Sequence, residues 1–248
     1  MHNHKLLLGS TIFVILMIAF VLVEFLFIKL GGTPVPAPTI SRELTTFGSS
    51  GTQLTYIVMG DSTGVGQGGD YEKGIALSTS RELAKTHIVR FQNFAISGAR
   101  TADVRQKQLA QAVALKPDVV LIAVGANDVT HLTSLKGIHL SLNEIIDALR
   151  AANPDVKIIL TGSPQMGSVP RFPEPVASIA RARTKSVNAV FEMVATEKQV
   201  TFAHIADKTG PIFDAHPELF AADKFHPTTT GYGVWIPVLN TAIASSTR

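Results

Sequence analysis

The amino-acid sequence predicts a three-layer α/β sandwich, in which helices cover both faces of a parallel β-sheet. Short apolar runs alternate with longer segments of helical spacing, a pattern typical of parallel strands joined by helical crossovers. The run at 56–59 is apolar on both faces and ends abruptly at Gly60, as expected of a buried strand. With 248 residues, 46% of them hydrophobic and 17% charged, the chain is long enough for one domain of about 200 residues and an appendage.

The predicted strands and helices alternate over the first part of this domain. They are a strand at 56–59, a helix at 71–85, a strand at 87–96, a helix at 101–115, a strand at 119–124, a helix at 140–152 and a strand at 156–160. Pro117 ends the second of these helices before the third strand. Because crossovers between parallel strands are right-handed, every strand-to-helix loop is expected at one rim of the sheet.

The C-terminal part of the chain predicts longer loops. Residues 163–175 carry four prolines and are expected to form an irregular rim loop that can wall a substrate pocket. A helix at 176–198 and a short fifth strand at 200–205 follow. Residues 207–230 are expected to be mostly loop, before a last helix at about 232–244.

Residues 1–30 form an apolar segment that predicts a membrane-spanning helix. No residue between Leu6 and Val23 is charged, and apolar residues continue to Ile28 after Glu24. A helix of this length can cross a hydrocarbon core of about 30 Å. An uncleaved signal anchor is favoured over a cleaved signal peptide, because the apolar run is long and no small-x-small site directly follows it.

Residues 31–50 are rich in proline and glycine, and they predict a partly extended linker before a domain at 51–248. A single N-terminal span, a linker and one domain form the layout of an exported, tethered protein. The domain is therefore expected outside the cytoplasm, and secretion after signal cleavage is the alternative. The chain has no cysteine, which excludes disulfides and thiolate chemistry.

Composition and spacing also limit the expected partners. The net charge of +3 is small and no long basic run occurs, which argues against nucleic acid. Residues 64–69 match the dinucleotide fingerprint G-x-G-x-x-G, but Asp61 and Ser62 separate these glycines from the strand and no acidic residue ends the second strand. No cofactor is therefore expected. No metal is predicted either, because no ligand spacing relates His87, His131, His139 and His204.

The expected rim loops supply the groups that acyl transfer needs. Ser62 follows the first strand, Gly98 the second and Asn127 the third, while Asp223 and His226 lie just before the last helix. A serine hydroxyl becomes a nucleophile when an imidazole takes its proton, and the imidazole needs an acceptor to fix its tautomer. The amides of Ser62 and Gly98 and the side chain of Asn127 can hold an oxyanion.

These residues lie in four blocks that resemble the SGNH (GDSL) hydrolases, a family of esterases and lipases. In chain order the blocks are Gly-Asp-Ser at 60–62, Asn-Phe-Ala-Ile-Ser-Gly at 93–98, Gly-Ala-Asn-Asp at 125–128 and Asp-Lys-Phe-His-Pro at 223–227. The resemblance implies a flavodoxin-like sandwich with a five-stranded parallel sheet. It also implies Ser62 as nucleophile and first oxyanion donor, Gly98 and Asn127 as further donors, His226 as base and Asp223 as its partner. Thr63 stands where the family's shorthand name has leucine, a position without a catalytic role.

The predicted function is serine-dependent hydrolysis of an ester through an acyl-enzyme intermediate. An acylated saccharide or cell-wall polymer and a lysophospholipid or short-chain lipid ester remain open as substrates. Acyl transfer to an alcohol other than water is an alternative, and so is a non-catalytic binding module, although the complete residue set disfavours the latter. Ser62 alone would equally suit a helix N-cap. His216, close to Asp214, is the competing base and lacks the position just before the last helix.

Overall fold

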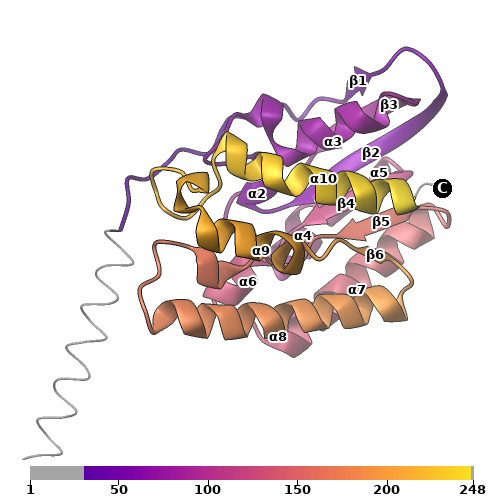
Figure 1. Cartoon of the computed structure of the whole chain (residues 1–248). Helices are drawn as coiled ribbons and strands as arrows, with labels where there is room; N and C mark the ends of the chain where they lie inside the picture. The colour runs from indigo at the N-terminus through magenta and orange to yellow at the C-terminus, as the bar shows by residue number, and fades with distance from the viewer. Residues whose placement is uncertain (1–30, 247–248) are drawn as a thin grey trace, which may run out of the picture.

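The chain folds into an α/β sandwich around one six-stranded sheet (Figure 1). The structure is a computed structural model that describes residues 31–246. Its strands are β1 (Thr45–Phe47), β2 (Thr52–Gly60), β3 (His87–Asn93), β4 (Val119–Ala123), β5 (Lys157–Leu160) and β6 (Thr201–Phe202), in the spatial order β1-β3-β2-β4-β5-β6. The predicted α/β class is confirmed.

Five of the strands are parallel, and β1 is an additional edge strand. β3, β2, β4, β5 and β6 pair in parallel, whereas β1 pairs antiparallel with β3. The predicted count of five strands is therefore one too low. β1 lies within residues 31–50, which were expected to be linker, and its three mostly exposed residues are too few to show a strand pattern.

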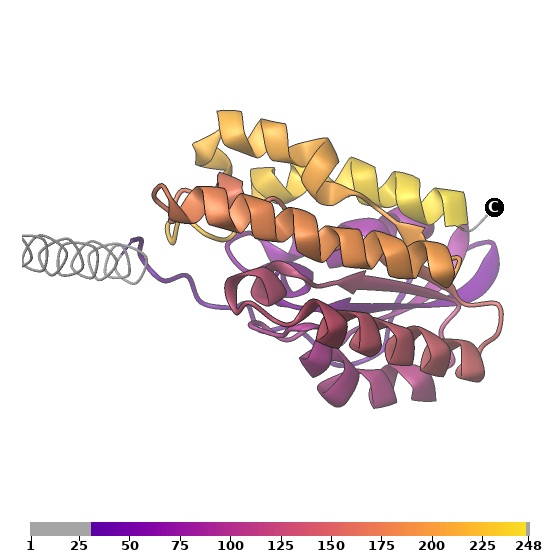
Figure 2. The ribbon, with the colours of Figure 1, turned by 90° about the horizontal axis from the view of Figure 1, so that it is seen from below.

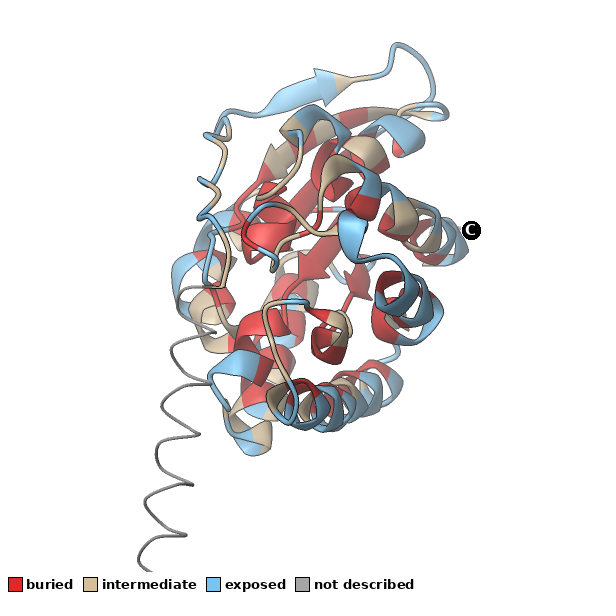
Figure 3. Cartoon of the chain, turned by 60° about the vertical axis from the view of Figure 1, so that its left-hand side comes forward, coloured by how far each residue is buried: buried red, intermediate tan, exposed pale blue. Residues whose placement is uncertain are grey.

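The central strands β2 and β4 are buried on both faces, and Figure 3 shows the buried residues concentrated there. Successive side chains of a strand point to opposite faces. Tyr56 and Val58 therefore enter one core, while Ile57 and Met59 enter the other. The hydroxyl of Tyr56 lies 2.8 Å from Thr79 Oγ1, and this hydrogen bond satisfies the polar end of a fully buried ring.

Helices cover both faces of the sheet (Figure 2). One face packs against α3 (Ile75–Leu83), α9 (Ile205–Ala215) and α10 (Thr229–Ser246). The other face packs against α4 (Thr101–Lys107), α5 (Leu109–Ala114), α7 (Leu135–Ala152) and α8 (Val176–Glu197). The short helices α2 (Ser62–Val65) and α6 (Ala126–Thr130) follow β2 and β4, and the 3₁₀ turns are η1 (Tyr71–Lys73), η2 (Met166–Ser168) and η3 (Pro217–Leu219).

Helix α9 corrects the expectation of a mostly irregular segment at 207–230. Gly210 and Pro211 disfavour a helix locally, because glycine is flexible and proline lacks an amide donor. Burial outweighs this local preference, since Ile205 and Phe213 are 2% and 5% exposed in the core. The helix therefore depends on tertiary packing that its own sequence does not reveal.

The predicted membrane-spanning segment falls in residues 1–30, outside the described residues. Between residues 31 and 246, no helix has both the length and the apolar character needed to cross a membrane. The segment expected to be a linker is described and contacts the domain. The amide of Thr33, for example, donates to the carbonyl of Ala222 at 2.9 Å.

Two buried polar side chains hold the turn that ends β2. Gln108 accepts from the amide of Gly60 and donates to its carbonyl, each at 2.8 Å. Asp61 accepts from the amide and the hydroxyl of Thr63 at 2.8 Å and so caps α2. Gly60 has a φ of +147°, and a Cβ there would lie 1.9 Å from the carbonyl oxygen of Ala123, so only glycine fits.

Gln108→Ala should lower the free energy of unfolding by about 1–3 kcal/mol, because it removes the acceptor of the buried Gly60 amide. Gln106→Ala is the matched control on the exposed side of α4, and it should change this free energy by less than about 0.5 kcal/mol. Urea unfolding measures both variants. Equal effects would mean that the bonds to Gly60 add no stability of their own.

Asp61→Asn should remove a pH dependence of stability. Burial raises the pKa of Asp61 to about 7, although hydrogen bonds from Thr63 lower it. The unfolded carboxyl has a pKa of about 3.9, so between these two values only the folded state binds the proton. The stabilisation is complete below about pH 4 and is lost as the pH rises through 7, by at most about 1.4 kcal/mol per pH unit.

Urea unfolding between pH 4 and 8 measures this slope in wild type and in Asp61→Asn. Asp70→Asn is the matched control, because Asp70 caps η1 at an exposed position by accepting from the amide of Glu72. It should keep the wild-type slope. If Asp61→Asn kept that slope as well, Asp61 would be ionised in the folded protein over this whole range.

Candidate active site

Ser62 begins the short helix α2 at the carboxyl end of β2. The cap formed by Asp61 and the close approach of Gly60 to β4 set the path of the chain into this helix. Ser62 is 5% exposed. Its position at the rim is therefore fixed by the buried turn before it.

Three of the predicted residues form a continuous hydrogen-bonded chain. Ser62 Oγ lies 3.0 Å from Nε2 of His226, and Nδ1 of His226 lies 2.6 Å from Oδ2 of Asp223. The side chains of His226 and Asp223 are 13% and 4% exposed. The structure thus brings together a hydroxyl, an imidazole and a carboxylate in the order in which proton transfer needs them.

A tight turn holds the carboxylate of Asp223, the last member of this hydrogen-bonded series. Oδ1 of Asp223 accepts from the amides of Phe225 and His226, each at 3.0 Å, and Lys224 has a left-handed φ of 55°. Burial acts to raise the pKa of Asp223, but hydrogen bonds from the His226 side chain and the two amides outweigh it, so this pKa is lowered. Asp223 therefore stays ionised at neutral pH and can accept a hydrogen bond from the N–H at Nδ1 of His226.

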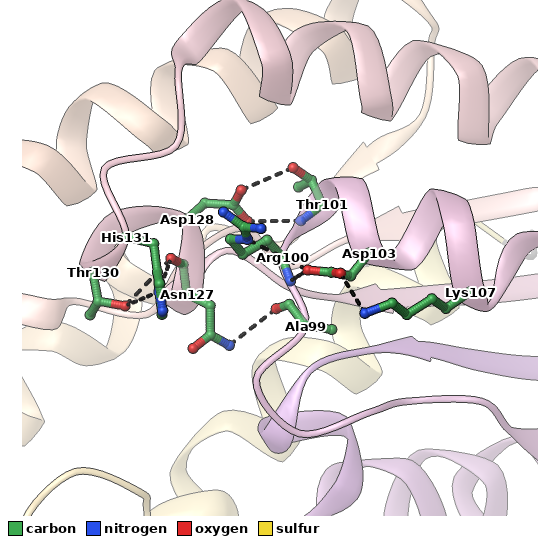
Figure 4. Close-up of polar contacts among 9 residues, drawn as sticks. All are labelled: Ala99, Arg100, Thr101, Asp103, Lys107, Asn127, Asp128, Thr130 and His131. Carbon is green, nitrogen blue, oxygen red and sulfur yellow. Dashed lines mark hydrogen bonds and ion pairs between the residues drawn. The ribbon is translucent and has the colours of Figure 1, made fainter.

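Hydrogen bonds join the loop of Gly98 to helix α6 (Figure 4). Asn127 Nδ2 donates to the carbonyl of Ala99 at 3.1 Å. The carboxylate of Asp128 accepts from the amide and the hydroxyl of Thr101, each at 3.0 Å. Gly98 has a φ of +80° with nothing within 4 Å of a Cβ built there, so its backbone conformation rather than lack of space favours glycine. The loop of Gly98 thus adjoins the helix that carries Asn127.

The competing histidine lies in a different environment. Nδ1 of His216 is 2.8 Å from Oε1 of Glu218, and both side chains are exposed. Asp214, the expected partner of His216, pairs with Arg181 at 2.9 Å instead. The alternative Asp214–His216 pair therefore does not form.

Two hollows meet at Phe225 and His226. The first is a partly enclosed cavity of about 30 Å³ beside Ser62. The second is an open groove of about 550 Å³ that also borders Asn127. We call it the apolar groove, and its large apolar side chains are Leu132, Phe172, Val176, Ile179 and Phe225.

The sequence indicated only part of this lining. The segment 163–175 was expected to wall a pocket, and it contributes to both hollows. Leu132 and Ile179 were not singled out, although they are 68% and 59% exposed. Leu132 is a large apolar residue in a rim loop, and Ile179 is one on a face of α8 that does not enter the core. This feature can be recognised only once the core-facing side of the helix is known.

The charged side chains that line the apolar groove are positive. Arg171 and Arg183 line it, and no carboxylate from residues 31–246 does. Arg183 also donates to the carbonyl of Thr133, which holds its guanidinium beside α6. Among residues 31–246, no group of three or more His, Asp or Glu side chains is arranged to hold a metal ion.

Comparisons with known proteins agree with this geometry. The model of the GDSL-like lipase/acylhydrolase family matches residues 58–234. The chain is 30% identical over 201 residues to a GDSL-like esterase of Mycobacterium tuberculosis, a match that covers 75% of this chain and 60% of that relative. It is 26% identical over 231 residues to a lipase of Streptomyces rimosus, which covers 75% of this chain and 86% of the lipase.

A solved structure supports the same fold. The lipase/acylhydrolase of Enterococcus faecalis superimposes with a TM-score of 0.60 at 20% identity, covering 77% of this chain and 96% of that one. The matched family segment runs from within β2 to within α10 and contains all five predicted site residues. The chain therefore belongs to the GDSL-like lipase/acylhydrolase family.

Proposed function

We propose that this chain is a carboxylic ester hydrolase in which Ser62 attacks the ester carbonyl. The observation that carries the proposal is the hydrogen-bonded chain from Ser62 through His226 to Asp223, with contacts of 3.0 and 2.6 Å. Membership of a family of lipases and acylhydrolases supports the same chemistry. The curated relatives are a GDSL-like esterase and a lipase, which points to an ester bond.

The proposed reaction has two half-reactions. Nε2 of neutral His226 accepts the proton of Ser62 while Oγ bonds to the carbonyl carbon. Asp223 accepts a hydrogen bond from Nδ1–H of His226 and stabilises the imidazolium, whose Nε2 proton then passes to the leaving alcohol as the carbon–oxygen bond breaks. A water molecule, deprotonated by His226, next attacks the acyl carbon and releases the acid and Ser62.

The oxyanion of each tetrahedral intermediate is assigned to the amides of Ser62 and Gly98 and the side chain of Asn127. The Asn127 amide nitrogen carries two hydrogens. Donation of one to the carbonyl of Ala99 fixes the plane of the amide and leaves the other for the oxyanion. A donor that is held in place before the reaction needs no reorganisation in the transition state.

The apolar groove is proposed to bind the acyl chain. It begins at Asn127 and His226, so an acyl chain leaving the carbonyl carbon can enter it directly. Its volume of about 550 Å³ lies in the range of small-molecule sites, whereas the partly enclosed cavity beside Ser62 has a volume of only about 30 Å³. Arg171 and Arg183 suit an anionic amphiphile. These features favour a lipid or lysophospholipid ester over a small acyl group on a saccharide.

Two related functions remain open beside hydrolysis. An alcohol could replace water in the second half-reaction and make the protein an acyltransferase, which uses the same residues. A non-catalytic binding module would not need a hydroxyl, imidazole and carboxylate in hydrogen-bonded order. We further propose that the domain lies outside the cytoplasm, tethered by the apolar run at 6–28, or secreted if that run is cleaved.

Ser62→Ala should lower kcat at least about 10³-fold while the protein stays folded, because no other group supplies the nucleophile. A fluorophosphonate should label the wild type at Ser62 and leave Ser62→Ala unlabelled. Ser163→Ala is the matched control, since Ser163 is a fully buried serine that follows β5 at the same rim. Labelling that persists in Ser62→Ala would refute Ser62 as the nucleophile.

Ile179→Asp should impair long acyl esters selectively. A carboxylate in the apolar groove removes apolar contact with the chain, and each buried methylene contributes about 0.8 kcal/mol. Relative to wild type, kcat/KM for p-nitrophenyl octanoate should fall on the order of tenfold more than kcat/KM for the acetate.

Met193→Asp is the control for this experiment, because Met193 is also an exposed apolar residue of α8 but does not line the groove. It should affect the two esters alike. An equal loss on acetate and octanoate in Ile179→Asp would place the acyl chain outside the groove.

A further inference from the structure

Residues 32–42 run along the rim that carries the site, and we call them the N-terminal arm (Figures 1 and 3). They precede β1 and lie outside the family match, which begins at residue 58. Their proline-rich sequence gave the expectation of a linker. The arm is instead hydrogen-bonded to three of the four segments that carry the site residues, namely the segment after Ser62, the loop before Gly98 and the turn of Asp223.

The first contact is with the turn of Asp223. The amide of Thr33 donates to the carbonyl of Ala222 at 2.9 Å. Gly32 packs directly on this turn, because a Cβ at Gly32 would lie 2.5 Å from the carbonyl oxygen of Asp223. Gly32 also has a φ of +133°, which other residues rarely adopt. The arm therefore fits against the backbone of the residue that orients His226.

The second contact runs through the side chain of Gln67, which follows α2. Its Nε2 donates to the carbonyl of Val35 at 2.9 Å, and its Oε1 accepts from the hydroxyl of Ser97 at 2.8 Å. Ser97 directly precedes Gly98. One amide side chain thus joins the arm to the loop after Ser62 and to the loop of Gly98.

The third contact is made by Arg42 at the other end of the arm. Its Nη1 and Nη2 donate to the carbonyls of Asn93 and Ala95 at 2.8 and 3.0 Å. These carbonyls lie at the end of β3, on the path to Gly98. The side chain of Asn93 continues the contact, because its Nδ2 donates to the carbonyl of Gly64 in α2 at 2.8 Å.

We propose that the N-terminal arm is a positioning part of the active site, with Arg42 as the positioning residue for the Gly98 loop. Loops at the rim of a sheet are the mobile part of such folds, and a displacement of about 1 Å can cost up to 10²-fold in rate. The arm bonds to all three loops and so limits their relative motion. The rate effect rests on the proposed ester hydrolysis, whereas the ordering of the loops does not.

Arg42→Ala, tested in the full-length chain, should lower kcat on the order of tenfold and change KM less than about threefold, because the loop it holds carries an oxyanion donor. Arg42→Lys should lie between Ala and wild type, since one ammonium cannot reproduce two forked bonds. Arg150→Ala is the matched control, because Arg150 donates to the carbonyl of Gln199 at the opposite end of the sheet.

Gly32→Ala tests the other end of the arm, because its Cβ displaces either the arm or the turn of Asp223. It should lower kcat, because a displaced carboxylate stabilises the imidazolium that forms in the reaction less. Gly233→Ala is the control, since nothing lies within 4 Å of a Cβ at Gly233.

Hydrogen–deuterium exchange of residues 94–100 and 221–226 gives a readout that needs no substrate. Faster exchange there in Arg42→Ala or Gly32→Ala, but not in the controls, supports the positioning role of the arm even if no ester is hydrolysed. Exchange that is unchanged in both variants overturns this positioning role. A kcat of both variants within twofold of wild type, in an enzyme that is active, overturns it as well. Should Arg42→Ala fail to fold, Arg42→Lys and Gly32→Ala decide in the same way.

Discussion

The parallel pairing of β2 with β4 is the constraint on which the site depends. The two strands are buried on both faces and in register from Tyr56 opposite Val119 to Gly60 opposite Ala123. Because they end at the same level, the turn into α2 and the turn into α6 emerge side by side. The absence of a side chain at Gly60 permits this, since its backbone lies against the carbonyl of Ala123. The nucleophile and Asn127 are therefore placed by core packing.

Three buried carboxyl groups at this rim differ in the direction of their pKa shift because their partners differ. Burial raises the pKa of Asp61 to about 7, and it also raises that of Asp128, where hydrogen bonds from Thr101 do not fully compensate. The pKa of Asp223 is lowered, because two amides and the imidazole of His226 outweigh burial. The carboxylate beside the imidazole is thus kept ionised, while the two that hold loops are the more readily protonated. Their residue type alone would not distinguish them.

Much of the fold and most of the site follow from local patterns in the sequence. β2 and β4 are apolar on both faces, and a glycine ends β2 and closely follows β4, so these strands and the residues after them could be predicted. α9 was missed because Gly210 and Pro211 give a local signal that packing overrides. β1 and the N-terminal arm were missed because they are held by backbone bonds and by Arg42, contacts that leave no periodic pattern. The apolar groove is built from three separate segments, so it emerges only on folding.

The point at which the described chain enters the domain has a consequence for how substrate is met. Gly32 lies on the backbone of Asp223, so the described part of the chain begins beside the site rather than at the far end of the sheet. If the apolar run before residue 31 is embedded in a bilayer, as we propose, the described chain enters the domain on the side that carries the site. A membrane amphiphile would then reach Ser62 by lateral diffusion in two dimensions. Its density per unit of membrane area, rather than its bulk concentration, would set the rate.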